Sequence, residues 1–402
     1  MHRIDSPGAE ADLFGAGKDG FTEGDPVSGV QPTEVGAKFL NALQQELCTL
    51  IENAGVAVAA SSDDDTYKQL HRVVRAIALK PLLAHLASDF EELDVGTSTI
   101  QMRAIATYLH TSGTQEGLVS VVAGGAGGSV VYSNDGGDSW ASATHAPTDV
   151  INKIVAGGGS FWLITDGGVS GALVTSLGTF TSYSTGLGGV DLCGGCWVSG
   201  PAYLLVVGDG GLVATGTTGA YTTRTSGTAQ DLKAAATRTD GVDDIVCAAG
   251  GTTIIRSDDG GVTWSTVSTA GTNFRDVFYD YTEELWLAVD DGGTWYSDDD
   301  GVTWTFWAGA SGTYGVAAAC GATFTFGSAA TAGYGCRVYM RDWESPFGIT
   351  WRSSADQLQI EHPLHFDTIV GQFWLVTNKD DAVYRSKKAP SAIVRALATG
   401  LG

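Results

Sequence analysis

Positive charge, proline, cysteine and long apolar runs are all scarce in this sequence of 402 residues. Lys and Arg together number 22 against 45 Asp and Glu, which gives a formal net charge of −23 and disfavours nucleic acid or anionic lipid as a partner. No stretch of 18 apolar residues occurs, so no membrane insertion is expected. Six cysteines in so long a chain do not make a disulfide framework, and the opening residues carry no apolar signal core. We therefore expect assembly inside a cell with reduced thiols.

Glycine, in contrast, is abundant, with 56 residues against 9 prolines. Hydrophobic residues make up 43% of the chain and charged residues 17%, which is a globular and not a disordered composition. From about residue 98 onward, short runs of Val, Ile, Thr and aromatic residues alternate with Gly and Asp. This texture predicts many short strands joined by tight turns.

One turn pattern, S-x-D-x-G-x-S/T-W, recurs through this β-rich region. Three copies are complete, and the others are degenerate but keep the frame. The frame places the following residues 40 to 47 positions apart: Trp140, Phe180, Tyr221, Trp264, Trp304, Trp351 and Ile393. A period in the low forties suits the four-stranded blade of a propeller. We predict a mainly β fold: a seven-bladed β-propeller over 98–402 that closes without a borrowed strand.

Each residue type in the pattern has a physical reason. Glycine at the fifth position supplies the positive φ that the reversal needs. The carboxylate accepts backbone N–H groups of the turn, and the hydroxyls add local bonds. The aromatic residue is expected to fill the wedge between adjacent blades. The turn residues are Ser133, Asp135, Gly137, Trp140, Ser257, Asp259, Gly261, Trp264, Ser297, Asp299, Gly301, Trp304 and, with four extra residues inside the turn, Asp342, Gly348 and Trp351.

The segment before the propeller has a different pattern. Residues 1–33 lack periodicity and read as an extended N-terminal arm. Apolar residues recur at steps of three and four over 34–54, and again from Ser62, which predicts helices in a helical attachment and oligomerisation domain at 34–97. These helices bury little surface alone, so their apolar faces should pack on copies of the chain or on a docking partner.

The repeated turn resembles the Asp-box, or bacterial neuraminidase repeat, of β-propellers. That resemblance implies structural turns lying away from the central channel, since the motif occurs in sialidases and in many non-enzymes alike. It supports the fold and leaves the activity open.

The N-terminal residues resemble a second family. Phe21–Pro26, Phe39–Glu46 and Ile51–Gly55, in this order, are similar to the start of tail-fibre and receptor-binding proteins of tailed bacteriophages and prophages. The resemblance covers residues 1–78. It implies attachment of this end to the tail or baseplate, commonly as a homotrimer, with Phe21, Pro26, Phe39 and Leu40 as candidate attachment residues.

An enzymatic reading is the alternative. A sialidase needs three arginines that hold the substrate carboxylate, and Arg103, Arg238 and Arg275 lie in or near predicted innermost strands. The early F/Y-R-I-P motif of that family is absent, and surface salt bridges are the preferred account of these arginines. A glycosidase with paired carboxylates stays open, although no spacing singles out a pair. We expect no enzyme activity and assign no catalytic residue.

Metal or cofactor chemistry is not predicted either. Cys193 and Cys196 form a lone C-x-x-C without a second pair, so ordinary buried thiols are the better account. His362 and His365 are spaced by three beside Glu361, which is a weak metal signal. We assign no metal site and no cofactor.

An insertion in the sixth turn, Trp343–Phe347, places two aromatic residues on a predicted loop. Loops on a rigid scaffold often carry recognition, so Trp343 and Phe347 are candidate receptor contacts, unless they cover a neighbouring blade or subunit. The resulting hypothesis is a tail-fibre or receptor-binding subunit in a virion tail, assembled in the host cytoplasm. It would dock through its N-terminus and contact the bacterial surface, with a polysaccharide as one candidate receptor, through the propeller. A surface-glycan hydrolase and an architectural tail protein are the alternatives.

Overall fold

The computed structural model divides the chain into two compact units, Met1–Pro81 with Asp342–Glu344, and Leu82–Arg341 with Ser345–Gly402. It describes residues 27–29, 31–32, 40–41, 44–46, 48–49, 90–93, 95, 102–111, 116–239, 244–267, 271–280, 284–309, 313–319, 322–329, 333–339, 347–349, 365–367, 372–376 and 383–386.

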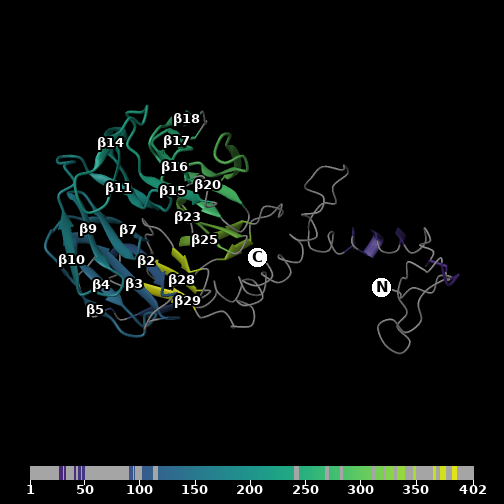
Figure 1. Cartoon of the computed structure of the whole chain (residues 1–402), viewed down its shortest axis with the longest axis horizontal. Helices are drawn as coiled ribbons and strands as arrows, with labels where there is room; N and C mark the ends of the chain where they lie inside the picture. Colours follow the sequence, from purple (N-terminus) through teal and green to yellow (C-terminus); the bar gives the residue numbers. More distant parts are fainter. Residues whose placement is uncertain are drawn as a thin grey trace. The chain divides into compact units, whose positions relative to one another are not determined.

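The second unit is built from sheets of short antiparallel strands (Figure 1). The first sheet contains β2 (Met102–Leu109), β3 (Val119–Gly125), β4 (Val130–Ser133) and β5 (Ala141–Ser142). The second contains β7 (Ile151–Gly157), β8 (Ser160–Thr165), β9 (Gly168–Leu173) and β10 (Thr179–Tyr183), with β6 (Thr144–His145) added parallel to β10. The third contains β11 (Leu192–Val198), β12 (Tyr203–Gly208), β13 (Val213–Gly216) and β14 (Thr222–Arg224).

Four further sheets complete the described part of this unit. The fourth contains β15 (Ala234–Thr239), β16 (Asp244–Gly250), β17 (Thr253–Ser257) and β18 (Ser265–Val267). The fifth contains β19 (Asp276–Asp280), β20 (Leu285–Asp290), β21 (Gly293–Ser297) and β22 (Thr305–Gly309). The sixth contains β23 (Thr313–Ala319), β24 (Ala322–Ala329), β25 (Gly333–Tyr339) and β26 (Phe347–Ile349). The seventh contains β27 (His365–Asp367), β28 (Gln372–Val376), β29 (Val383–Ser386) and β1 (Phe90–Leu93).

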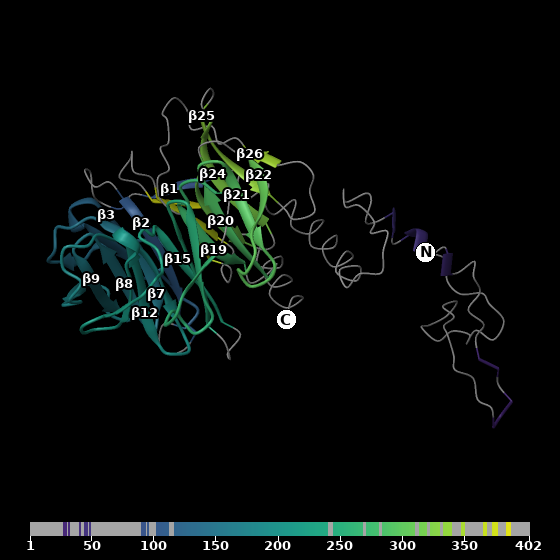
Figure 2. The same cartoon turned by 90° about the horizontal axis from the view of Figure 1, so that it is seen from above.

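The first strands of successive sheets contact one another around a central axis (Figure 1, Figure 2). β2 contacts β7, and the contacts continue through β11, β15, β19 and β23 to β27, which contacts β2 again. The ring therefore closes, and the fold is a β-propeller, as the period of the turn pattern predicted.

The ring closes differently from the sequence prediction. β1 pairs antiparallel with β29, with Phe90 opposite Ser386 and Leu93 opposite Val383, so the N-terminal side of the chain supplies the outer strand of the seventh sheet. The prediction of closure without a borrowed strand is therefore wrong, and β1 lies before the predicted propeller start at 98. An unpaired edge on the last sheet would expose backbone donors and acceptors, which β1 satisfies. The strand predicted near 392–398 lies outside the described residues.

Strand direction defines two faces of the propeller. The connections between first and second strands lie on the same face as those between third and fourth strands, because neighbouring strands are antiparallel. We call this the repeat-turn face. Backbone bonds join the two kinds of connection there, from Gly136 N to Val119 O and from Gly260 N to Asp244 O. The opposite face, which carries the connections between second and third strands and between sheets, is called the rim face.

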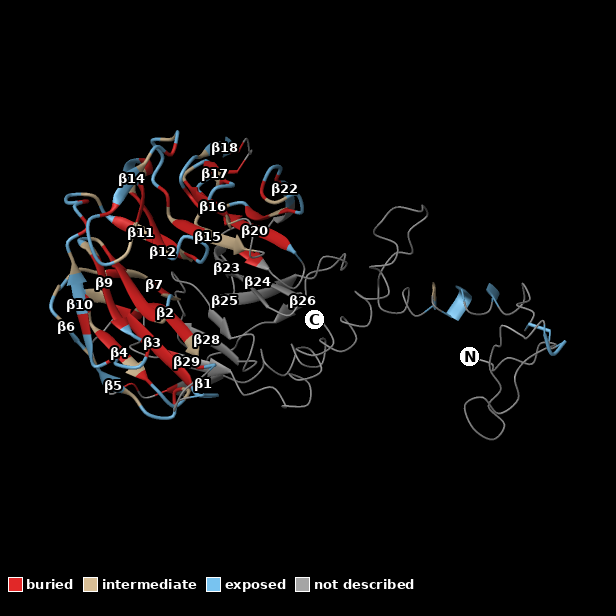
Figure 3. Ribbon diagram, viewed as in Figure 1, coloured by how far each residue is buried: buried red, intermediate tan, exposed pale blue. Residues whose placement is uncertain are grey.

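The core lies between adjacent sheets, where buried side chains are concentrated along the strands (Figure 3). One cluster joins the fourth and fifth sheets through Cys247, Ile254, Trp286 and Trp295. Another joins the seventh and first sheets through Leu93, Val95, Ile105 and Val383. Each of the first four sheets thus buries both of its faces against neighbours, which stabilises a ring of small sheets.

Little of the N-terminal unit is described. Within the helix predicted over 34–54, the described residues 40–41, 44–46 and 48–49 are helical, and the side chain of Leu40 is half exposed. Phe21, Pro26 and Phe39 lie outside the described residues. Over the part of the chain that the structure describes, no helix is long and apolar enough to cross a membrane.

Candidate functional site

The complete repeat turns share one hydrogen-bond pattern. In the turn of the fourth sheet, Ser257 Oγ donates to Asp259 Oδ1 over 2.7 Å and accepts the N–H of Gly261 over 2.8 Å. Thr263 donates to the same carboxylate through its backbone N over 2.8 Å and its hydroxyl over 2.7 Å. Trp264 Nε1 donates to the carbonyl of Gly261 over 3.0 Å. The bonds predicted for the carboxylate and the hydroxyls are therefore present.

The same bonds recur at the other complete copies. They link Ser133, Asp135, Gly137, Ser139 and Trp140 in the first sheet. They link Ser297, Asp299, Gly301, Thr303 and Trp304 in the fifth sheet. Burial would raise the pKa of all three turn carboxylates, but the hydrogen bonds from the hydroxyl and backbone donors outweigh it and lower each pKa.

The turn glycine is required by geometry as well as by conformation. Gly261 has φ of +99°, and a Cβ placed on it would meet Leu205 Cδ1 of the third sheet at 2.3 Å. The glycine thus lets one sheet pack closely on its neighbour while the chain reverses.

The aromatic residues lie between adjacent sheets, as predicted. Trp304 is buried in the cluster between the fourth and fifth sheets, and Trp264 packs on the cluster between the third and fourth. Of the degenerate copies, Phe180 is buried between the first and second sheets and Tyr221 between the second and third. These residues serve packing, so the repeat turns are scaffold.

The seventh position of the frame is filled from elsewhere. Trp264 precedes Ser265, which pairs with Arg256, the residue before the turn serine. Trp140 and Trp304 occupy the same position relative to the turn serines of their own sheets. In the seventh sheet this register belongs to Phe90, which lies opposite Ser386. Ile393, which the sequence placed there, lies outside the described residues.

The sixth turn departs from the prediction. Gly348 pairs with Arg337 and Phe347 with Val338 in β26, so Gly348 is a strand residue and not a turn glycine, and Phe347 is not on a loop. The outer strand β26 therefore begins at Phe347, before the place where the repeat pattern predicts the turn to end. Asp342, Trp343 and Trp351 lie outside the described residues.

The three arginines considered for a sialidase-like site do not converge. Arg238 lies toward the repeat-turn end of β15 and pairs with Asp300 at 3.5 Å. Arg275 lies just before β19, at the rim face, and pairs with Asp291 at 2.6 Å. Arg103 lies in β2 near the rim face. Salt bridges account for Arg238 and Arg275, as the alternative interpretation expected.

A second repeated feature, an irregularity in strand pairing, lies on the rim face, and the sequence analysis did not predict it. In the first three sheets the inner strand carries a β-bulge near its start, and the fourth and fifth sheets have a bulge-like backbone bond at the same place. Arg103, Asn152 and Cys193 are skipped in the pairing of β2, β7 and β11. The N–H of Lys233 donates to the carbonyl of Ala249, the residue that pairs with Ala234. In the same way, the N–H of Arg275 donates to the carbonyl of Val289, which pairs with Asp276. We call Arg103, Asn152, Cys193, Lys233 and Arg275 the bulge residues. Bulges re-aim side chains at barrel rims and binding sites.

Aspartates of the connections between second and third strands face the bulge residues. Asn152 Nδ2 donates to Asp166 Oδ1 over 2.6 Å and to the carbonyl of Leu192 in the next sheet over 2.8 Å. Lys233 Nζ lies 3.1 Å from Asp209 Oδ1 and 3.5 Å from Cys193 Sγ, both in the preceding sheet. These bonds hold polar groups of adjacent sheets in fixed positions.

The fifth sheet repeats the arrangement with stronger partners. Arg275 Nε and Asn273 Nδ2 donate to the two oxygens of Asp291, over 2.6 and 2.8 Å. Burial would raise the pKa of Asp291, but these bonds outweigh it and lower the pKa. The pKa of Asp231, which accepts the N–H of Gly210 and lies 3.6 Å from Lys233, is lowered by both contacts. These rim carboxylates are therefore ionised at neutral pH.

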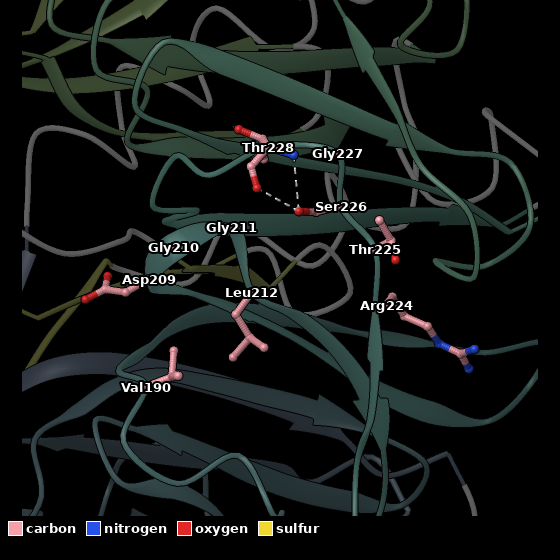
Figure 4. A pocket seen from close by; sticks show the side chains of 10 residues that line it. All are labelled: Val190, Asp209, Gly210, Gly211, Leu212, Arg224, Thr225, Ser226, Gly227 and Thr228. Atoms are coloured by element: carbon pink, nitrogen blue, oxygen red, sulfur yellow. Dashed lines mark hydrogen bonds between the residues drawn. The ribbon is translucent and has the colours of Figure 1, made fainter.

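A shallow hollow of about 600 Å³ opens beside the bulge residues of the third and fourth sheets (Figure 4). It lies between the turn Asp209–Gly211 and residues 224–228, with Val190 and Leu212 at its apolar side. Ser226 Oγ bonds to the backbone of Thr228 and fixes this wall. Gly211 has φ of +78°, and a Cβ there would meet the carbonyl oxygen of Thr228 at 2.0 Å, so only glycine fits.

The thiols of Cys193 and Cys196 lie where the protein disfavours the thiolate form. Burial raises the pKa of Cys193 to about 11 and that of Cys196 to about 12, so both are neutral at pH 7. Over the described residues, no group of three His, Cys, Asp or Glu side chains is arranged to hold a metal ion. His365 begins β27, and His362 lies outside the described residues.

The rim thus presents oriented carboxylates, amides, hydroxyls and cations, which suits hydrogen-bonded recognition of a polar ligand. Asp-Gly-Gly occurs at 166–168, 209–211 and 291–293 in these rim connections, but the same tripeptide at 135–137 and 259–261 belongs to repeat turns, so the sequence alone did not single out the rim. The bonded partners of the rim aspartates also lie on other strands.

A comparison with curated proteins finds a relative for part of the chain. No protein-family model matches the chain. A stretch of 79 residues is 42% identical to the "Uncharacterized protein StfP" of Escherichia coli strain K12, covering 20% of this chain and 36% of that protein. The chain therefore spans about a third of the length of the curated relative it matches.

Solved structures with the same architecture include "YCF48 bound to D1 peptide", with a TM-score of 0.54 and 11% identity over 74% of this chain and 94% of that chain. YCF48 from Cyanidioschyzon merolae gives a TM-score of 0.53 and 13% identity over 74% and 98% of the two chains. The extracellular domain of a putative one-component system from B. thetaiotaomicron gives 0.54 and 11% over 74% and 43%. At these identities the likeness is one of fold alone.

Proposed function

We propose that this chain is a tail-fibre subunit of a tailed phage or a phage-derived particle. The observation that carries the proposal is the 42% identity with StfP over 79 residues, which supports a tail-fibre role at a coarse level. That stretch is about as long as the N-terminal segment 1–78, which carries the tail-fibre-like motifs. In this proposal the N-terminal segment docks to the tail or baseplate, and the propeller contacts the bacterial surface.

The architecture supports a division of labour. The propeller is a separate compact unit with its own core, so it can present a rigid surface without help from the attachment segment. Tail fibres act in several copies, and linked weak contacts give strong attachment without any chemistry. A homotrimer built through the N-terminal helices is part of the proposal.

The test is binding of the purified full chain to bacterial cells and to their purified surface polysaccharide. We expect binding without shortening of the polysaccharide, measured by cell pull-down and by gel filtration of the polysaccharide. Shortening would favour the hydrolase, and no binding to any bacterial strain would leave the architectural role.

Oligomeric state is a separate test. Light scattering coupled to gel filtration should give three times the 41.6 kDa chain mass. A monomer that persists at high protein concentration would count against docking as a trimeric fibre.

A further inference from the structure

We infer that Arg103, at the start of the inner strand of the first sheet, binds the carboxylate group of an external ligand. This inference goes beyond the proposed function, because it assigns a binding site of stated chemistry and holds whether or not the chain belongs to a tail fibre. Its basis is a difference between equivalent positions of the repeated sheets.

Arg103 has no acidic partner among the described residues. Its Nε is buried and donates to no acceptor, although the side chain as a whole is only part-buried. The chain has 45 acidic residues against 22 basic ones, so a shortage of carboxylates does not explain this. A buried donor without a partner costs free energy. The other arginines whose side chains the structure describes each have a hydrogen bond or an ion pair: Arg224, Arg238, Arg256 and Arg275.

The fifth sheet shows what an arginine at this position binds when the chain itself supplies the partner. Arg103 and Arg275 are both bulge residues at the start of an inner strand. Arg275 Nε donates to Asp291 Oδ1 over 2.6 Å. The same nitrogen, Nε, is the one left without an acceptor in Arg103.

Aspartate recurs at the partner position in the connection between second and third strands. Asp166, Asp209 and Asp291 lie 2.6, 3.6 and 2.6 Å from the side chain of the bulge residue of their own sheet. The backbone N–H of each donates to a carbonyl shortly before the inner strand, over 3.1 to 3.2 Å. The three aspartates are therefore equivalent.

In the first sheet this position holds alanine. The connections Ala126–Gly128 and Asp209–Gly211 have the same backbone, and their middle residues, Gly127 and Gly210, both have φ of +65°. Alanine thus stands where the third sheet has aspartate. Alanine is aspartate without its carboxylate, so the first sheet keeps the bulge arginine of the fifth sheet and lacks the group that this arginine would bind.

The fourth sheet shows the rival explanation. Gly251 stands at the partner position there, and Lys233 pairs at 3.1 Å with Asp209 of the preceding sheet instead. The sheet that precedes the first is the seventh, and its connection at 377–382 lies outside the described residues. Its sequence includes Asp380 and Asp381, so the experiment must separate these two carboxylates from an external one.

A carboxylate is the ligand group that this position fits. The planar guanidinium matches the two oxygens of a carboxylate, and Asp291 shows that pairing in the equivalent place. The net charge of −23 disfavours an anion with several charges, such as phosphate, more than it disfavours a single carboxylate.

The experiment measures binding of small probes to the full-length chain by titration calorimetry at low ionic strength. We expect acetate and glucuronate to bind, glucose not to bind, and inorganic phosphate to bind at least tenfold more weakly than acetate. Tighter binding of glucuronate than of acetate would assign the carboxylate to an acidic sugar, and equal binding would assign the site to the carboxylate group alone. Either result supports the inference, whereas phosphate binding as tight as that of acetate would overturn it.

Two variants locate the site. Arg103→Gln removes the guanidinium, and Ala126→Asp supplies the internal carboxylate that the third and fifth sheets have. We expect each to weaken acetate binding at least tenfold. Ala126→Asp should not lower the unfolding temperature, because the equivalent backbone of the third sheet carries Asp209. Arg256→Gln is the control: its Nε already donates to the carbonyl of Asp300 over 2.7 Å, so its loss should leave acetate binding unchanged.

A third variant tests the rival explanation. Asp380→Asn combined with Asp381→Asn should leave acetate binding unchanged if Arg103 is unpaired in the wild type. An increase of tenfold or more would show that these carboxylates hold Arg103, and would overturn the inference. Unaltered binding by Arg103→Gln, or no binding of any carboxylate by the wild type, would overturn it as well.

Discussion

The two faces of the propeller repeat different things. On the repeat-turn face the side chains recur: Ser, Asp, Gly and Trp make the same bonds in three sheets. On the rim face it is the backbone arrangement that recurs, at the start of the inner strand in each of the first five sheets. The side chain at that position differs: it is Arg in the first and fifth sheets, and Asn, Cys and Lys in the second, third and fourth. The first face repeats side-chain chemistry because the same locally bonded turn recurs in those three sheets.

This difference teaches how to separate scaffold from candidate site without any homologue. Where the repeated residues bond within their own turn, changing one costs stability. Where repeated geometry presents unlike side chains that bond across sheets, a change costs little stability and alters what the surface can bind. The expectations that follow test this contrast, beginning with the largest effect.

Removal of β1 should have the largest effect of all. A chain that starts at residue 98 lacks the outer strand of the seventh sheet and the buried side chains of Leu93 and Val95. Those two side chains alone contribute roughly 3–6 kcal/mol. We expect a much lower unfolding temperature than for a chain that starts at residue 82, measured by differential scanning calorimetry. Equal stability of the two chains would show that another strand closes the ring.

Trp304→Ala should come next. The side chain is 8% exposed and lies between the fourth and fifth sheets, so its loss leaves a cavity and should lower the free energy of unfolding by about 3–5 kcal/mol. Trp304→Phe, which keeps most of the volume, is the control. A loss below 1 kcal/mol for the alanine variant, measured by denaturant titration, would contradict the packing role.

Ser257→Ala should have a smaller effect. Its hydroxyl accepts the N–H of Gly261, and that donor would be left buried without a partner, at a cost of about 1–3 kcal/mol. Ser265→Ala is the control: this exposed hydroxyl in β18 donates to the carbonyl of Arg256 over 3.2 Å, and its loss leaves no buried donor unpaired, so the cost should be smaller. Similar losses for both variants would mean that the turn is not specially dependent on its serine.

Acid should weaken the repeat turns. The folded-state pKa of Asp259 lies below its ordinary value of 3.8, so the stabilisation is fully present above that value and is lost as pH falls through the lowered pKa. The unfolding temperature of the wild type should therefore fall more steeply below about pH 4 than that of Asp259→Asn. Parallel pH profiles for the two proteins would contradict this.

Lys233→Ala should have the smallest effect on folding. Its side chain is 40% exposed, and such ion pairs contribute less than about 1 kcal/mol. The unfolding temperature should stay within a few degrees of the wild type, whereas the rim surface loses a cation. A loss as large as that of Trp304→Ala would break the contrast between the faces.

Sequence reasoning reached the turns because their chemistry is local. Ser257, Asp259 and Trp264 bond within eight residues, so spacing alone was sufficient to infer their bonds and their frame. Phe180 and Tyr221 could be placed because the turns from Trp140 to Trp264 are spaced by 40 to 43 residues. The sixth copy was misassigned at Gly348, since an insertion breaks the period and only strand pairing fixes the register.

The sequence by itself determined a ring of four-stranded sheets, the frame of its turns and the aromatic wedge between neighbours. Tertiary structure decided that Phe90 closes the ring opposite Ser386, and that Lys233 meets Asp209 across two sheets at the rim. The physical reason is range: a turn is specified by bonds among adjacent residues, whereas pairing between residues nearly three hundred positions apart depends on the closed ring that brings them together.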